Sequence, residues 1–246
     1  TIGVRTDAGV ETRPVTLRRS HHGPVFEVTP GRHYAIRKAN QDAGSLFPQY
    51  YAIATARTLD DFKAAFDMQR LVYHNFMYGD VDGNIFYLYG GAHPRKDPGF
   101  DWERPVDGSD PATEWRGGLA QSEIPQVLNP TSGWLQNANA SPFFASDAAD
   151  NPAASAFPPY LVREAHARTR LPFIDADGNG ARARQSRRIL RAEREITFDR
   201  WTRLATDRYF LTADEELPAL FDEWARFSRA EPERSRTLAD PIRQLR

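Results

Sequence analysis

The chain has 246 residues, of which 40% are apolar and 26% charged, the profile of a soluble globular protein. Its 32 basic and 33 acidic residues leave a formal charge of -1, so the chain as a whole has no general attraction for nucleic acid or anionic membranes. Cysteine is absent, which excludes disulfides, thiolate metal sites and a cysteine nucleophile, and no apolar run approaches the roughly 18 residues of a membrane span.

The first ninety residues favour strands. Asp7-Ala8-Gly9 is a turn signal that predicts a hairpin between residues 2–5 and 10–17, and residues 25–28 and 34–37 are two further short strands. Apolar residues at helical spacing predict a helix over 59–72. Residues 75–89 are strongly β-forming, and Asp82-Gly83 in their middle predicts a hairpin with a type I′ turn.

The rest of the chain divides into a loop region and a helical region. Residues 91–160 are rich in Gly, Pro, Asn and Ser, which predicts a long ordered loop region of the kind that often carries function. Residues 161–246 are predicted to be mainly helical, and 217–227 has a clear apolar stripe at helical spacing. With the sheet-rich residues 1–90, this order predicts an α+β fold.

Histidine, acidic and arginine clusters give only weak signals. No histidines have the spacing of a metal-binding pair, and the His21-His22 doublet is not expected to place both rings on one face of a strand. Residues 175–180 resemble half of a calcium-binding loop, but Ser186 stands where the bidentate Glu is required, so a polar turn is favoured. Residues 181–208 carry nine arginines, and a solvated or inter-subunit helix face is favoured over a nucleic-acid contact.

By spacing alone the chain contains no complete active site. It has no GxSxG elbow, no GxGxxG loop and no Walker motif. Thr1 is a candidate N-terminal nucleophile, because a terminal α-amine can act as the general base for its own hydroxyl. The competing interpretation is that position 1 simply leads into a hairpin strand.

A row of short motifs, in order and at family-like spacing, gives a more specific signal. The motifs are HGPV (22–25), NFMYGDVDGNI (75–85), GGAHPR (90–95), RPVDG (104–108), WRG (115–117), IP (124–125) and NPTSGWLQNANASP (129–142). Together they resemble the large (β) subunit of the penicillin acylase (penicillin amidase) family of N-terminal nucleophile hydrolases. The resemblance is strongest over residues 18–147 and fades over the last forty.

The resemblance implies an αββα sandwich of antiparallel strands and an amidohydrolase that cleaves an acyl side-chain amide. In this family a serine at the start of the β subunit, exposed by autocatalytic cleavage, is the nucleophile. Thr1 aligns within that subunit, so we expect the chain to be an internal segment, inactive alone. Its expected partners are the α subunit, the rest of the β subunit and a small amide substrate, with no nucleic acid and no membrane span. Periplasmic or extracellular localisation is also expected.

The resemblance also assigns two catalytic candidates. Asn139 matches the family's oxyanion-hole asparagine, whose neutral NH₂ group donates to the negative charge that develops on the substrate oxygen. The competing interpretation is that Asn137 and Asn139 only form a turn before Pro142. Arg182 matches an arginine near that asparagine and the terminal amine, and Arg184, Arg187 and Arg188 are alternatives.

Further positions carry over to the substrate pocket and to a metal site. Tyr50 or Tyr51, with His74, falls near the acyl pocket, and the polar His74 puts penicillin G itself in doubt as the substrate. The family needs no cofactor for chemistry but binds one structural calcium ion. Asp147 aligns with a carboxylate ligand and Trp102 with a backbone carbonyl, and the other ligands are expected upstream.

Two functions therefore remain open. The first is a part of an amide-hydrolysing acylase that acts on β-lactam amides, acyl-homoserine lactones or acylated peptides. The second is a non-catalytic acylase-like scaffold or binding domain, in which Asn139 is an ordinary turn residue. The encoded sequence upstream of Thr1 would discriminate between them, because a Gly-Ser-Asn-like processing site favours the enzyme.

Overall fold

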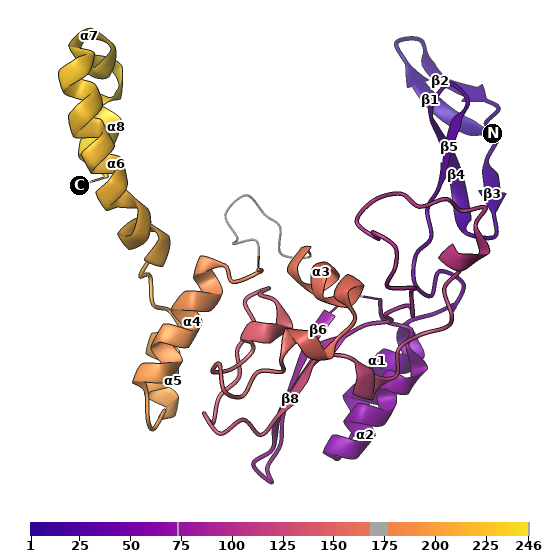
Figure 1. The fold of residues 1–246 in the computed structure, drawn as a ribbon, viewed down its shortest axis with the longest axis horizontal. Helices are drawn as coiled ribbons and strands as arrows, with labels where there is room; N and C mark the ends of the chain where they lie inside the picture. The colour runs from indigo at the N-terminus through magenta and orange to yellow at the C-terminus, as the bar shows by residue number, and fades with distance from the viewer. Residues whose placement is uncertain (73, 168–176, 246) are drawn as a thin grey trace.

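The computed structural model describes residues 1–72, 74–167 and 177–245. The chain forms an open arc in which the first five strands lie at one end and the C-terminal helices at the other (Figure 1). Between them lies a three-stranded sheet with helices near it. Helices and antiparallel strands are thus both present, as the α+β prediction requires.

The predicted N-terminal hairpin is confirmed. Strands β1 (Ile2–Thr6) and β2 (Gly9–Arg13) pair antiparallel, with Ile2 opposite Arg13, around a turn at Asp7-Ala8. The second strand ends earlier than predicted because Pro14 has no N–H to donate to a strand ladder.

A second small sheet has the order β3 (Arg18–Ser20), β4 (Gly23–Thr29), β5 (Arg32–Ala35). Gly23 begins β4 with a φ of +133°, and a Cβ there would lie 2.1 Å from the carbonyl oxygen of Ile36. Only glycine fits this close approach without a shift of the backbone. Gly23 therefore fixes the turn at His21-His22 against the chain that follows β5.

The helix predicted over residues 59–72 is shorter than expected. Helix α2 (Leu59–Ala64) starts at a capping box between Thr58 and Asp61, and continues as the 3₁₀ helix η1 (Ala65–Met68). Gln69, with a φ of +45°, ends it. Helix α1 (Phe47–Thr55) precedes it and was not predicted.

The central sheet has the order β6 (His74–Gly79), β7 (Ile85–Gly90), β8 (Gln126–Leu128). The hairpin predicted over 75–89 is confirmed, but its loop is the five residues 80–84 rather than a two-residue type I′ turn. Asp80 closes this loop by accepting hydrogen bonds from the backbone and side-chain nitrogens of Asn84. Phe86, Leu88 and Leu161 are fully buried at the centre of the core.

Between β7 and the next long helix the chain contains little regular structure apart from β8. Short 3₁₀ helices interrupt it: η2 (Pro111–Thr113), η3 (Gln121–Glu123), η4 (Pro142–Phe144) and η5 (Ala154–Ala156). Polar contacts hold the loops in place, such as the two-point ion pair of Arg95 with Glu123.

Helices dominate the remaining described residues. They are α3 (Pro159–Ala167), α4 (Ala181–Ala192), α5 (Phe198–Ala205), α6 (Leu211–Ala230), α7 (Pro232–Ser235), η6 (Arg236–Leu238) and α8 (Ala239–Gln244). Helix α6 carries the predicted apolar stripe, yet none of its residues is fully buried. It projects away from the central sheet (Figure 1).

The chain exposes an unusually large surface. A compact monomer of 27.9 kDa exposes about 11,000 Å², whereas this chain exposes 16585 Å². Large apolar side chains contribute, including Phe198 at 80% and Trp201 at 52% exposure on α5. Among the helices of the described residues, none has the length and apolarity of a membrane span.

Candidate functional site

The candidate oxyanion donor lies in a strained turn. Asn139 has a φ of +59°, in the left-handed region that asparagine tolerates better than most residues. Its backbone N–H donates to Oδ1 of Asn137 at 3.0 Å, which forms an Asx turn. The turn that the competing interpretation of Asn137 and Asn139 predicts is therefore present. It leaves the side chain of Asn139 available for another role.

The side chain of Asn139 is held by Arg182. Nη2 of Arg182 donates to Oδ1 of Asn139 at 2.9 Å. A guanidinium group has only donors, so the atom that faces it must be the amide oxygen and not the nitrogen. The NH₂ group of Asn139 is thereby left as the end of the amide that can donate elsewhere.

A backbone contact supports the same arrangement. The N–H of Ser141 donates to the carbonyl oxygen of Gly178 at 3.0 Å. Gly180, two residues after Gly178, is the N-cap of α4. Arg182 lies in the first turn of this helix, so its position follows from the contact between the 139–141 turn and residues 178–180.

Asn139 and Arg182 line a cavity of about 700 Å³. Its wall is mainly apolar, with a few polar groups that include Gln185, Ser186 and Asp207. The apolar part comes from three helices and the turn, through Ala138, Ile189, Ala205, Phe210 and Leu211. A mainly apolar cavity with a few polar groups at one end is typical of a small-molecule site.

The other arginines of α4 contact different partners. Arg184 pairs with Glu215 of α6 at 2.6 Å, and Arg188 donates to the Tyr209 hydroxyl at 3.0 Å. Arg187 is buried against the ring of Phe144 and donates to Asn179. Burial, with the charges of Arg191 and Arg184, lowers the pKa of Arg187. Of the four arginines considered from the sequence, the described contacts therefore place Arg182 on Asn139.

The three residues predicted for the acyl pocket lie near one another but are exposed. The rings of Tyr50 on α1 and His74 on β6 meet edge to face, with centroids 6.5 Å apart. Tyr51 instead stacks on Phe47 at 6.2 Å. The geometry thus pairs Tyr50, rather than Tyr51, with His74.

A hydrogen bond joins β6 to the Asn139 turn. Nδ2 of Asn75, the residue after His74, donates to Oδ1 of Asn137 at 3.3 Å. The same oxygen accepts the backbone N–H of Asn139. The strand that carries His74 and the turn that carries Asn139 are therefore neighbours through one shared acceptor.

The two residues predicted for calcium have other partners. Asp147 accepts two hydrogen bonds from Arg191 at 2.6 and 3.0 Å, and this contact is the main reason why the pKa of Asp147 is lowered. The Trp102 indole N–H donates to the carbonyl oxygen of Asp97 at 2.7 Å. Both residues thus have other partners in this structure, Asp147 through Oδ1 alone, and the calcium site stays a prediction.

One cluster of possible metal ligands was missed by the sequence analysis. Among the described residues, ligand atoms of His21, His22 and Glu114 lie within 4.8 Å of one another. The expectation that the histidine doublet cannot place both rings on one face of a strand does not apply, because these residues form the turn between β3 and β4. Strand alternation does not apply in such a turn.

Two weaker candidates remain untested. Thr1 is exposed and leads directly into β1. Asp175, the first residue of the half calcium-binding motif, lies outside the described residues, whereas Asp177 accepts the backbone N–H of Asn179 in a polar turn.

Comparison with known proteins agrees with the motif row. The penicillin amidase family model matches residues 1–246. The penicillin G acylase of Escherichia coli is 43% identical over 68 residues, which cover 28% of this chain and 8% of that protein. The penicillin acylase 2 proenzyme of a Pseudomonas species is 26% identical over 155 residues, which cover 62% of this chain and 20% of that protein.

A solved structure of the thermostable penicillin G acylase from Alcaligenes faecalis aligns with 49% of this chain and 22% of its own, at 27% identity and a TM-score of 0.44. The chain spans a fifth or less of the length of the curated relatives named above. The match of the family model to every residue shows that this chain belongs to the penicillin amidase family.

Proposed function

We propose that this chain forms the oxyanion-stabilising wall of a penicillin-acylase-type amidohydrolase. The observation that carries the proposal is the hydrogen bond from Arg182 to Oδ1 of Asn139 at the edge of the 700 Å³ cavity. It fixes which end of the Asn139 amide is free to donate. Family membership supplies the reaction class, an acyl transfer from an amide to water.

In the proposed reaction a terminal serine outside this chain attacks the carbonyl carbon of the substrate amide. The serine's α-amine takes the hydroxyl proton, and the carbonyl oxygen becomes negatively charged. Nδ2 of Asn139 donates to that oxygen, and the charge of Arg182 on Oδ1 polarises the amide in the same sense. As the intermediate collapses and its C–N bond breaks, the protonated α-amine returns its proton to the leaving nitrogen. The α-amine then takes a proton from the water that hydrolyses the acyl-enzyme, and the serine hydroxyl is restored.

Asn139 suits this role because it is neutral. A side-chain NH₂ group donates without competing for the protons that the α-amine must move. Loss of one such donor costs about 2.7–4 kcal/mol of transition-state stabilisation. The left-handed backbone of Asn139 also fits the tendency of strained residues to occur at functional sites.

The acyl group would be recognised near Tyr50 and His74. Their edge-to-face contact offers one aromatic wall with a polar imidazole beside it. A pair of side chains of this kind suits an acyl chain that carries a polar or aromatic group. Tyr51, turned toward Phe47, is the weaker candidate.

The remainder of the acylase, its α subunit and the rest of its β subunit, is the proposed partner. The excess exposed surface and the bare aromatic face of α5 support this proposal, because isolated domains seldom leave such groups in water. The sheet β6–β8 would belong to an αββα sandwich. Among the described strands β6 pairs only with β7, so its other edge is available to a further strand.

A structural calcium ion and export to the periplasm or beyond remain predictions of the family resemblance. Calcium binding at Asp147 would require that Arg191 leave the carboxylate, or that other ligands outweigh its charge. The proposed reaction has no step that depends on the ion.

The second function is a non-catalytic acylase-like scaffold, which the exposed apolar surface also favours. Asn139→Ala in the complete protein separates the two. The acylase proposal predicts a fall in kcat of about 10²–10³-fold with the fold intact. Asn40→Ala is the matched control, because Asn40 is also an exposed asparagine with a left-handed backbone, at a φ of +54°. An unchanged kcat in Asn139→Ala would remove Asn139 from the mechanism and favour the scaffold.

A further inference from the structure

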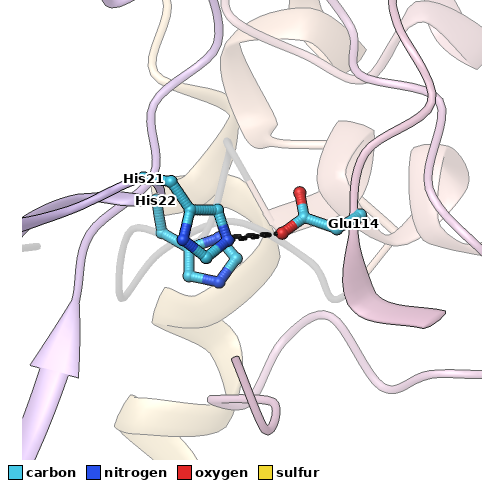
Figure 2. Close-up of side chains that lie close together, drawn as sticks. All are labelled: His21, His22 and Glu114. Atoms are coloured by element: carbon cyan, nitrogen blue, oxygen red, sulfur yellow. Dashed lines mark hydrogen bonds and ion pairs between the residues drawn. The ribbon is translucent and has the colours of Figure 1, made fainter. Parts of the chain in front are cut away.

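We propose that His21, His22 and Glu114 form a binding site for a divalent metal ion of the zinc class. The three side chains come from two places that are far apart in the sequence, the β3–β4 turn and the residue after η2. Figure 2 shows both imidazole rings beside the carboxylate of Glu114. In the arc of Figure 1 the strands β3 and β4 lie at the end opposite α4, so this site is separate from the Asn139 cavity.

The ligand atoms converge on one oxygen. Nε2 of His21 lies 2.6 Å from Oε1 of Glu114, and Nδ1 of His22 lies 3.7 Å from the same atom. The two ring centroids are 3.8 Å apart, and the ring planes are tilted by 43°. Two imidazole nitrogens and one carboxylate oxygen thus lie within 4.8 Å of one another, which is the kind of three-ligand set that open zinc sites use.

The second ring nitrogen of His22, the one that would not bind the metal, already has a hydrogen-bond partner. Nε2 of His22 lies 2.8 Å from the carbonyl oxygen of Gly108, a group that can only accept. Nε2 of His22 is therefore a donor, and in the neutral ring this leaves the lone pair on Nδ1, which faces Glu114. A backbone carbonyl that orients a histidine in this way is a common outer partner at metal sites.

The backbone of Gly108 approaches the ring of His22 so closely that it leaves little space for a side chain. A Cβ at this position would lie 3.1 Å from Nε2 of His22, so a side chain would press on the ring. The ring is also largely enclosed, with its side chain 13% exposed. His22 is therefore a preorganised ligand, whereas His21, at 66% exposure, is the ligand that can adjust.

The carboxylate is also oriented. Nη1 of Arg37 donates to Oε2 of Glu114 at 2.5 Å and leaves Oε1 to the two histidines. Nε2 of His21 lies at hydrogen-bond distance from Oε1, and a bound ion would take the place of that contact.

A cavity of about 390 Å³ adjoins one of the three ligands, and His21 and Arg37 line it with Trp115 and residues 38–43. In the proposal a water molecule or a small anion approaches the ion from the side of His21 and completes a tetrahedral shell. Imidazole and carboxylate together favour Zn²⁺ and its neighbours over calcium and magnesium, which prefer all-oxygen shells.

The test is the binding of Zn²⁺ to the full chain, purified with any polypeptide that copurifies. Zinc content and affinity are measured by competition with a chromogenic chelator, and Co²⁺ absorption reports on the shell. The proposal predicts one ion per chain, and an affinity at least tenfold weaker in His21→Ala. His33→Ala is the matched control, because His33 is an exposed histidine on β5 that contacts Arg18.

His21→Ala is chosen because its side chain is exposed, and circular dichroism checks that both variants fold as the wild type does. Glu114→Gln is a second variant, which keeps the shape of the side chain and removes its charge. No zinc on the wild-type chain, or equal affinity in wild type and His21→Ala, would overturn the proposal. So would an equal loss in His33→Ala, because binding would then be spread over surface histidines.

Discussion

Arg182 donates from Nη2 to Oδ1 of Asn139 at 2.9 Å, across 43 positions of sequence. The contact joins the first turn of α4 to the strained turn that precedes η4. In the proposed mechanism this contact makes Arg182 a positioning residue for the asparagine amide.

Arg182→Ala in the active protein is expected to lower kcat by about 10–100-fold, the range found when a partner that orients a functional ligand is lost. KM should change little, because the contact is made with Asn139 and not with the acyl group. Steady-state kinetics with a chromogenic anilide measures both values. Arg194→Ala, an exposed position beyond the end of α4, is the control. Equal kcat values in the two variants would count against the positioning role.

His74→Leu is expected to change the preference among acyl groups rather than the rate of the chemical step. Removal of the imidazole beside Tyr50 leaves a more apolar wall. The ratio of kcat/KM between a plain aromatic and a polar acyl group should shift toward the aromatic one by about tenfold. A panel of amides with one leaving amine measures the ratio, and His33→Leu is the control. An unchanged ratio would place His74 outside the acyl pocket.

The hydrogen bonds of Asp150 predict that the loop region around Thr131 and Ser132 loses stability in acid. Hydrogen bonds from the hydroxyl of Thr131 and the backbone N–H of Ser132 lower the pKa of Asp150 from 3.8 to about 2. A lowered pKa means that the ionised form stabilises the fold above pH 4, and that this contribution is lost as the pH falls from about 4 to 2. Asp150→Asn should flatten the stability curve in that window.

The measurement is thermal unfolding between pH 2 and pH 6. Asp222→Asn, a change at an exposed acid on α6, is the control. A pH dependence that is the same in Asp150→Asn and the wild type would show that this carboxylate does not contribute.

Gly23→Ala tests the close approach that fixes the β3–β4 turn. The new Cβ would lie 2.1 Å from a backbone oxygen, so the strand must move, at a cost of about 1–3 kcal/mol in the free energy of unfolding. Gly31→Ala is the matched control, because Gly31 has a φ of +76° but no atom within 4 Å of its Cβ position. Denaturant unfolding compares the two. A loss no greater in Gly23→Ala than in Gly31→Ala would show that the clash is relieved without cost.

The local parts of the fold could be predicted from sequence where short-range chemistry determines them. The hairpins around Asp7-Ala8 and residues 80–84 follow from turn residues between β-forming runs. Helix α1 was missed because six of its nine residues are aromatic, β-branched or proline, which are poor helix formers. The early end of helix α2–η1 depends on Gln69, whose left-handed backbone has no sequence signal.

The long-range parts of the site could not be derived from local patterns. Which arginine of α4 reaches Asn139 depends on the contact between Ser141 and Gly178, far apart in the sequence. Family resemblance proposed Arg182, and the described contacts place that residue on the asparagine. Sequence reasoning missed the cluster of His21, His22 and Glu114 for two reasons. Glu114 comes from a loop some ninety residues away, and the alternation of side chains along a strand does not apply to the two histidines because they lie in a turn.

A double-mutant cycle with Asn139→Ala and Arg182→Ala tests the central claim most directly. If Arg182 acts by holding the asparagine amide, its removal should cost kcat in the wild-type background and nothing further once Asn139 is alanine. The measurement is kcat for the four proteins with one anilide substrate. Equal and additive losses from the two substitutions would contradict the claim, because they would mean that the residues act independently.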